Sequence, residues 1–109
     1  MSAYQAPTPT REEIDAAPGP VLLDFGTNWC GYCQAAAPHV ETALRAAPAV
    51  RDMAVRHIKV EDGPGRALGR SFRVKLWPTL IALQDGVEVA RSVRPTSEAE
   101  IAAVLARLG

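Results

Sequence analysis

Residues 21–25 of this chain form a short apolar run, Val-Leu-Leu-Asp-Phe, with chain-breaking residues on both sides of it. Residues 18–20 (Pro-Gly-Pro) stand directly before the run, and Gly26 follows it. An apolar run of this length between breakers predicts a strand that is buried on both faces. Asp24 is the exception within it, because burying a lone carboxylate is costly unless the group is hydrogen-bonded or functional.

The rest of the chain alternates between helical and strand patterns. A capping box at Thr10–Glu13 opens a first helix, and Ser97 with Glu100 opens the last helix in the same way. The dipeptide Asp85-Gly86 between two apolar stretches predicts a tight hairpin. The expected elements are, in order, a helix at 10–17, a strand at 21–25, a helix at 31–47, a strand at 53–60, a helix at 66–72, strands at 80–83 and 87–93, and a helix from 97 onward.

This alternation predicts an α/β fold in which a central mixed β-sheet is flanked by helices on both faces. The 109 residues suit one domain. We place that domain at 10–109 and interpret residues 1–9 as a mobile arm or a weak edge strand. Apolar residues three and four positions apart predict the buried sides of two helices, namely Ala37, Val40 and Leu44, and Ile101, Val104, Leu105 and Leu108.

Charge and cysteine content exclude several classes of function. Twelve basic and twelve acidic residues give a net charge of zero, which removes any general electrostatic case for a nucleic acid or an anionic membrane as partner. Two cysteines are too few for a disulfide-stapled secreted domain. The first nine residues carry neither a basic region nor an apolar stretch, so we expect no secretory signal and a cytoplasmic location.

The two cysteines lie three positions apart in Trp29-Cys30-Gly31-Tyr32-Cys33, where the expected buried strand gives way to the long helix. This spacing near a strand–helix unit is typical of thiol–disulfide redox chemistry. Cys30 is expected at the helix N-terminus, where free N–H groups and the helix dipole stabilise an anionic sulfur. A thiolate is the attacking species in such exchange. We therefore assign Cys30 as the exposed nucleophile and Cys33 as the more buried resolving thiol.

A metal centre is the alternative interpretation of the cysteine pair. Paired cysteines at this spacing also bind zinc, but a closed zinc site requires two more ligands. The only histidines are His39 and His57, and neither belongs to a second paired motif. An iron–sulfur cluster shared between two chains meets the same difficulty. We predict no metal and no bound cofactor.

Over residues 21–109 the sequence resembles the thioredoxin family. The matching segments are the run 21–25, the cysteine motif 29–33, Pro38, the segment 77–80 (Trp-Pro-Thr-Leu), the glycine of the 85–86 turn and the last amphipathic helix. The resemblance implies the thioredoxin fold. It also implies that Asp24 is the buried carboxylate behind Cys33, which accepts and returns a proton through water.

The resemblance further implies a substrate-binding surface beside the cysteines. Pro78 is the expected cis-proline, and the backbone of Trp77 is expected to pair with an extended substrate segment. The candidate catalytic residues are then Cys30, Cys33 and Asp24, with Cys30 and Cys33 forming the redox disulfide. The candidate substrate-binding residues are Trp29, Gly31, Tyr32, Trp77 and Pro78.

Four residues depart from the family pattern. Tyr32 replaces a proline, and we expect a less reducing cysteine pair than in a typical thioredoxin. Gly26 replaces a tryptophan, which predicts more room and more solvent near Asp24. His57 replaces a lysine near that aspartate, and we favour a surface or strand-end role for it over the tuning of proton transfer. Arg94 replaces a glycine and predicts a narrower or more polar substrate surface.

The predicted function is therefore a thiol–disulfide oxidoreductase that reduces or exchanges disulfides of protein substrates. We expect a monomer that is reduced by an external thioredoxin reductase or a similar thiol reductant. One alternative is a thioredoxin-like interaction subunit dedicated to a single partner, with little general reductase activity. Another is an oxidase or isomerase of an oxidising compartment, which the absence of a signal sequence disfavours.

Overall fold

A computed structural model describes residues 3–4 and 7–109 of the chain. The order of helices and strands predicted above is confirmed. In chain order they are α1 (Arg11–Ala16), β1 (Pro20–Gly26), α2 (Gly31–Ala46), β2 (Arg56–Glu61), α3 (Ala67–Ser71), β3 (Thr79–Gln84), β4 (Val87–Val93) and α4 (Glu98–Leu105).

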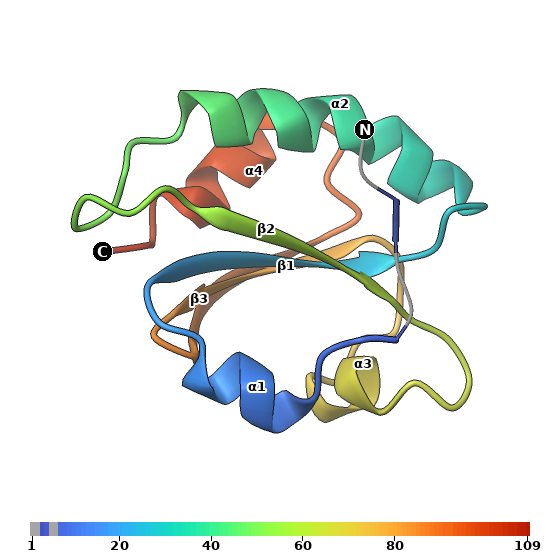
Figure 1. The fold of residues 1–109 in the computed structure, drawn as a ribbon. Coiled ribbons are helices and arrows are strands. Elements are labelled where there is room, and N and C mark those ends of the chain that lie inside the picture. The colour runs from blue at the N-terminus through green and yellow to red at the C-terminus, as the bar shows by residue number, and fades with distance from the viewer. Residues whose placement is uncertain (1–2, 5–6) are drawn as a thin grey trace.

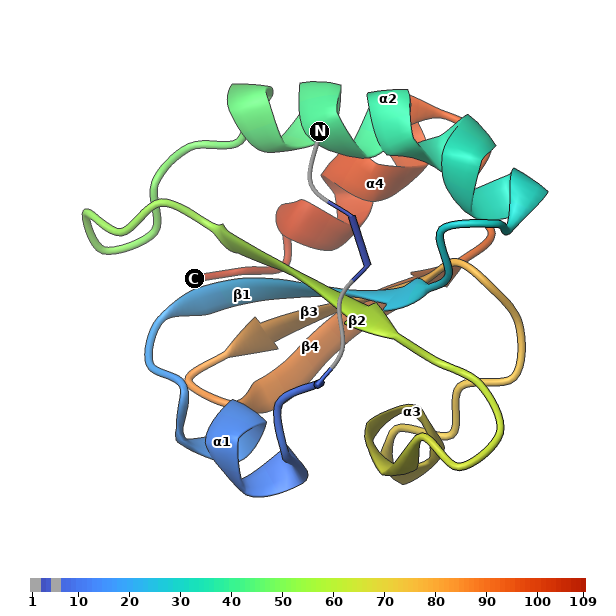
Figure 2. The ribbon, with the colours of Figure 1, turned by 45° about the vertical axis from the view of Figure 1, so that its right-hand side comes forward.

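The four strands form one mixed sheet in the order β2-β1-β3-β4. Strand β1 lies parallel to β2 and antiparallel to β3, and the β3–β4 hairpin is antiparallel. Asp85 and Gly86 join β3 to β4 with φ of 51° and 82°, the left-handed conformation that a two-residue hairpin turn favours. Helices α2 and α4 cover one face of the sheet and α1 and α3 the other (Figures 1 and 2). This arrangement is the predicted thioredoxin fold.

Strand β1 is buried along its whole length, as the apolar run predicts. Because side chains alternate along a strand, Val21, Leu23 and Phe25 face the core beneath α1 and α3, while Leu22 faces the core beneath α2 and α4. Asp24 falls on the same face as Leu22. The strand therefore points its one carboxylate toward the side of the sheet on which α2 carries the cysteines.

Helix α2 buries a different stripe from the predicted one. The buried residues are Cys33, Ala36, Val40 and Ala43, whereas the predicted Ala37 and Leu44 are only half-buried. The prediction was right for Val40 and wrong for Ala37, because periodicity does not show which of two adjacent alanines faces the sheet. Leu44 is half-buried and packs against the core beneath α2 and α4. This orientation turns Cys33 inward and leaves Gly31 and Tyr32 exposed.

Strand β2 begins three residues later than predicted. Val50 and Met53 form an isolated antiparallel bridge, with Arg51 and Asp52 between them at φ of 51° and 64°. Met53, the first residue of the expected strand, therefore belongs to this tight turn, and β2 begins only at Arg56. In the last helix Ile101, Val104 and Leu105 are buried as predicted, while Leu108 lies beyond the helix and is half-buried.

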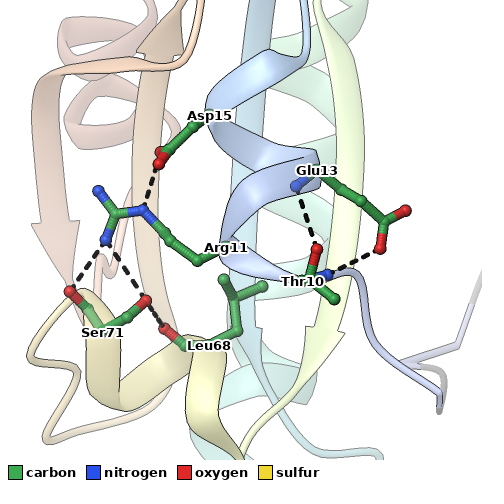
Figure 3. A network of polar contacts seen from close by, with 6 residues as sticks. All are labelled: Thr10, Arg11, Glu13, Asp15, Leu68 and Ser71. Carbon is green, nitrogen blue, oxygen red and sulfur yellow. Dashed lines mark hydrogen bonds and ion pairs between the residues drawn. The ribbon is translucent and has the colours of Figure 1, made fainter.

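The first helix is held by its cap and by one arginine (Figure 3). Thr10 Oγ1 accepts from the Glu13 N–H at 3.1 Å, and Glu13 Oε1 accepts from the Thr10 N–H at 3.0 Å, which completes the predicted capping box. Arg11 pairs with Asp15 at 2.8 Å and donates to the Ser71 carbonyl at 3.0 Å. Arg11 thus connects α1 to the end of α3, the two helices that cover the face of the sheet opposite α2 and α4 (Figure 1).

Of the segment 1–9, residues 1–2 and 5–6 lie outside the described structure. Residues 3–4 and 7–9 belong to no helix or strand, but Tyr4 is buried and is considered with the site below. Within the described residues, no helix has both the length and the apolar character required to cross a membrane.

Candidate active site

The cysteine pair lies at the start of α2. Cys30 is the N-cap residue of the helix, and its sulfur accepts a hydrogen bond from the Cys33 N–H at 3.2 Å. The two cysteines are not joined in a disulfide, and both are buried. The hydrogen bond and the positive end of the helix dipole stabilise negative charge on the Cys30 sulfur. Cys30 was predicted to be exposed, but the structure shows it to be 6% exposed, almost as buried as Cys33 at 4%.

Cys33 is a poor acid in this environment. Burial is the largest cause, followed by the hydrogen bond with Cys30, and together they raise the pKa of the Cys33 thiol to about 12 from its usual 9.0. The Thr27 backbone and the Tyr4 hydroxyl act in the opposite direction. Cys33 consequently carries its proton at neutral pH, and any step in which it attacks requires a base.

Asp24 is a buried carboxylate near the cysteine pair, and a carboxylate can act as a base. It is 3% exposed on β1, and both of its oxygens have protein partners. The Tyr4 hydroxyl donates to Oδ1 at 2.5 Å, and His57 Nε2 lies 2.9 Å from Oδ2. The favoured surface or strand-end role of His57 was therefore wrong, because this side chain is half-buried on β2 and directly contacts the aspartate.

Tyr4 is the residue of the site that sequence reasoning missed. Its ring fills the space beside Gly26, where an added Cβ would lie 2.9 Å from the phenol oxygen and 2.5 Å from Cys33 Sγ. The expectation of extra room and solvent at Gly26 was wrong for this reason. The glycine at position 26, where the family has a tryptophan, was the signal that another residue fills the gap.

Two tryptophans form a rim beside the cysteines. The rings of Trp29 and Trp77 meet edge to face, 5.7 Å apart, and Trp29 is 75% exposed. Trp77 also donates from Nε1 to Asp62 Oδ2 at 2.8 Å, which fixes its indole. The peptide bond from Trp77 to the buried Pro78 is cis, the form that the family resemblance implies. The structure thus brings together the predicted substrate-binding residues of both segments.

Arg94 closes one side of this surface. Its Nε donates to the Trp77 carbonyl at 2.9 Å, and its guanidinium lies 4.1 Å from the centre of the Tyr32 ring. Its own N–H donates to the Pro78 carbonyl at 2.8 Å. Arg94 therefore takes up a hydrogen bond of the backbone carbonyl next to the cis-proline, where a narrower or more polar surface was predicted.

Among the described residues, no group of three or more His, Cys, Asp or Glu side chains is placed to hold a metal ion. His57 is already paired with Asp24, and His39 lies further along α2, half-buried.

The chain is similar to known thioredoxins in both sequence and structure. A family model described as Thioredoxin matches residues 4–107, so the match begins inside the segment 1–9 that sequence analysis set apart. The chain is 38% identical to a thioredoxin of Mycobacterium tuberculosis over 82 residues, which are 75% of this chain and 67% of the relative. A bifunctional thioredoxin reductase/thioredoxin of Mycobacterium leprae is 35% identical over 82 residues, 75% of this chain and 17% of that protein. The solved structure of thioredoxin 2 from Pseudomonas aeruginosa in its reduced form is similar with a TM-score of 0.81 and 49% identity, over 96% of each chain.

Proposed function

This chain belongs to the thioredoxin family and is a thiol–disulfide oxidoreductase, and we propose that Cys30 attacks its protein substrates while Cys33 resolves the mixed disulfide. The observation that carries these roles is the hydrogen bond from the Cys33 N–H to the Cys30 sulfur at the start of α2. It stabilises the attacking thiolate at Cys30. Cys33, with its raised pKa, remains a thiol until the second step.

In the first step the Cys30 thiolate attacks one sulfur of a substrate disulfide. A new S–S bond joins Cys30 to the substrate, and the other substrate sulfur leaves as a thiolate with the electron pair of the broken bond. In the second step Cys33 loses its proton and attacks the Cys30 sulfur. The substrate leaves as its second thiolate, the Cys30–Cys33 disulfide forms, and two electrons have passed from the dithiol to the substrate.

The remaining partners are part of the same proposal. Returning the disulfide to the dithiol requires an external two-electron reductant, and the M. leprae relative, whose name joins a thioredoxin reductase to a thioredoxin, supports a reductase of that kind. A dithiol that must be re-reduced suits the cytoplasm, where thiols are kept reduced. All of the side chains assigned above come from one chain, which supports a monomer as the working unit. The comparisons do not favour the alternative of a binding module dedicated to one partner.

The assignment of the two cysteines is tested with insulin as the protein disulfide. Cys33→Ser stops after the first attack, so it should accumulate a covalent adduct with insulin that survives a non-reducing gel and gives the mass of a mixed disulfide. Cys30→Ser is the matched variant and should give no adduct. An adduct with Cys30→Ser but not with Cys33→Ser would reverse the roles, and the absence of an adduct with either variant would contradict the proposal.

A further inference from the structure

Tyr4 is a buried titratable side chain for which the exchange steps above have no role. It is 8% exposed and packs in one small cluster with Cys30 and Cys33. Its main chain is fixed at Asn28, since the Tyr4 N–H donates to Asn28 Oδ1 at 2.9 Å and Asn28 Nδ2 donates to the Tyr4 carbonyl at 3.2 Å. The phenol is therefore held in a defined place beside the cysteines.

The Tyr4 hydroxyl lies at the junction of the base and the thiol. It donates to Asp24 Oδ1 at 2.5 Å, while the Tyr4 side chain packs in one cluster with Cys33 and its hydroxyl acts to lower the pKa of that thiol. The Cβ position of Gly26 marks the same place, because a carbon there would lie 2.5 Å from Cys33 Sγ and 2.9 Å from the Tyr4 oxygen. Glycine at position 26 is therefore what allows the phenol to reach the thiol.

We propose that Tyr4 is a catalytic residue whose hydroxyl relays the proton of Cys33 to Asp24 during resolution of the mixed disulfide. The proposal rests on the role assigned to Cys33 in the proposed function. In place of the water expected from the family resemblance, a side chain of the N-terminal segment links the two groups. The relay consists of Cys33, Tyr4 and Asp24, and it lies on the face of the sheet covered by α2.

The relay consists of two proton transfers, which together carry one proton from Cys33 to Asp24 and leave Tyr4 neutral. In the structure the Tyr4 O–H donates to Asp24 Oδ1, which leaves the phenol oxygen able to accept. In the proposed step the Cys33 proton passes to that oxygen as the phenol proton passes to Asp24. Transfer of both protons leaves a thiolate on Cys33, an intact phenol on Tyr4 and a protonated carboxyl on Asp24. The thiolate electron pair then forms the S–S bond with Cys30, and the substrate sulfur departs with the electron pair of the broken bond.

The surroundings of Tyr4 keep the phenol neutral, as a relay requires. Burial, and next the charge of Asp24, raise the pKa of Tyr4 above its usual 10.0, so the hydroxyl retains a proton for transfer. The other charged group facing the ring is Lys59, whose Nζ lies 4.4 Å from the ring centre. His57, on the second oxygen of Asp24, is half-buried and gives the transferred proton a path toward solvent.

The relay is tested with 5,5′-dithiobis(2-nitrobenzoate) as the disulfide, mixed rapidly with the reduced protein. The first release of thionitrobenzoate reports attack by Cys30, and the second reports resolution by Cys33. Thionitrobenzoate leaves as an anion, so the loss of the Cys33 proton is the only proton transfer in the second step. Tyr4→Phe keeps the ring that fills the space at Gly26 and removes only the hydroxyl.

In Tyr4→Phe at neutral pH we expect the ratio of the second to the first release rate to fall by about tenfold to a hundredfold. The deficit should narrow as the pH rises, because hydroxide then removes the Cys33 proton directly. Thr42→Val is the matched control in which this ratio should not fall, because it removes a hydroxyl from α2 that lies nine positions after Cys33 and donates to the Pro38 carbonyl at 2.9 Å.

A second variant separates a relay from a packing effect. If Tyr4 acts through Asp24, adding Tyr4→Phe to Asp24→Asn should slow the second release no further. Multiplicative effects of the two changes, a second release in Tyr4→Phe that matches the wild type, or an equal slowing of both releases would each overturn the relay. A wild-type protein that gives the first release without the second would instead contradict the resolving role of Cys33.

Discussion

Arg94 makes a hydrogen bond to the Trp77 carbonyl, which is then not available to bond an extended substrate segment. Its Nε bonds the Trp77 carbonyl, next to the cis-proline where the family resemblance places an extended substrate segment. One hydrogen bond is worth about 0.5–1.5 kcal/mol net. Arg94→Gly should therefore raise kcat/KM for reduction of insulin by about two- to tenfold.

The comparison variant at this position is Arg94→Ala. Arg94 has φ of 52°, a conformation that glycine adopts freely and alanine does not. Both variants free the Trp77 carbonyl, but only glycine does so without retaining the strain. Steady-state insulin reduction, coupled to a fixed reductant, measures both. A kcat/KM in Arg94→Gly at or below that of the wild type would show that the arginine does not restrict the substrate surface.

Tyr32 bears on the reduction potential through its backbone. It lies in the first turn of α2, where N–H groups have no partner within the helix. A tyrosine supplies an N–H that the family proline lacks, and this donor stabilises the thiolate form and hence the reduced state. We expect a potential above the value of about −270 mV typical of thioredoxin.

Equilibration of the protein with glutathione buffers, followed by measurement of the oxidised fraction, gives this potential. Tyr32→Pro removes the N–H and should make the potential more negative, whereas Tyr32→Phe keeps the N–H and should retain the wild-type value. A wild-type potential at or below about −270 mV, or no change in Tyr32→Pro, would contradict the argument.

At the scale of elements, α1 depends strongly on its N-terminus because it has only six residues. Thr10 and Glu13 satisfy each other's backbone N–H groups there (Figure 3). Thr10→Ala removes one of these bonds and should lower the free energy of unfolding by about 1 kcal/mol. Urea denaturation of the oxidised protein measures this change.

The hydrogen bond from the Thr10 N–H to Glu13 Oε1 can be weakened in steps, which tests the same cap from its other side. Glu13→Gln retains an oxygen that can accept from the Thr10 N–H, so it should cost less than Glu13→Ala. The effects of Thr10→Ala and Glu13→Ala should not be additive, since both break one box. Full stability in Thr10→Ala would mean that the contacts of Arg11 with α3 hold α1 without the cap.

The helices and strands that could be predicted from the sequence are those whose ends are set by residues only a few positions away along the chain. The breakers around residues 21–25, the capping residues Thr10 and Ser97 and the Asp85-Gly86 turn act within a few positions, and each marks an element found in the structure. The face of α2 could not be assigned in this way, because the choice between Ala36 and Ala37 depends on what packs against the helix.

At the scale of the whole molecule, the site joins segments that no local pattern connects. Cys30 was predicted from the cysteine spacing at the start of the helix, and Asp24 from its place in the apolar run and from the family resemblance. Tyr4 was not predicted, since its hydrogen bond to Asp24 joins residues 20 positions apart and its fit depends on the missing side chain at Gly26. His57 reaches the same aspartate from a neighbouring strand, 33 positions away.

The burial of Cys33 and Tyr4 makes the free energy of unfolding of the reduced protein fall at alkaline pH. Cys33 has a usual pKa of 9.0 and a folded pKa of about 12, with burial as the main cause. Between these values the unfolded chain has lost the proton that the native state keeps. The free energy of unfolding therefore stays at its full value below pH 9 and falls as the pH rises toward 12, by up to about 1.4 kcal/mol per pH unit for this group.

Tyr4 adds to this loss above pH 10, because burial also raises its pKa from that usual value. Urea denaturation of the reduced protein at successive alkaline pH values measures the slope. Cys33→Ala removes one buried acid and should flatten the slope, and Tyr4→Phe should flatten it only in the upper part of the window. Parallel loss of stability in the wild type and in both variants would mean that other groups cause it, because neither buried proton would then be coupled to folding.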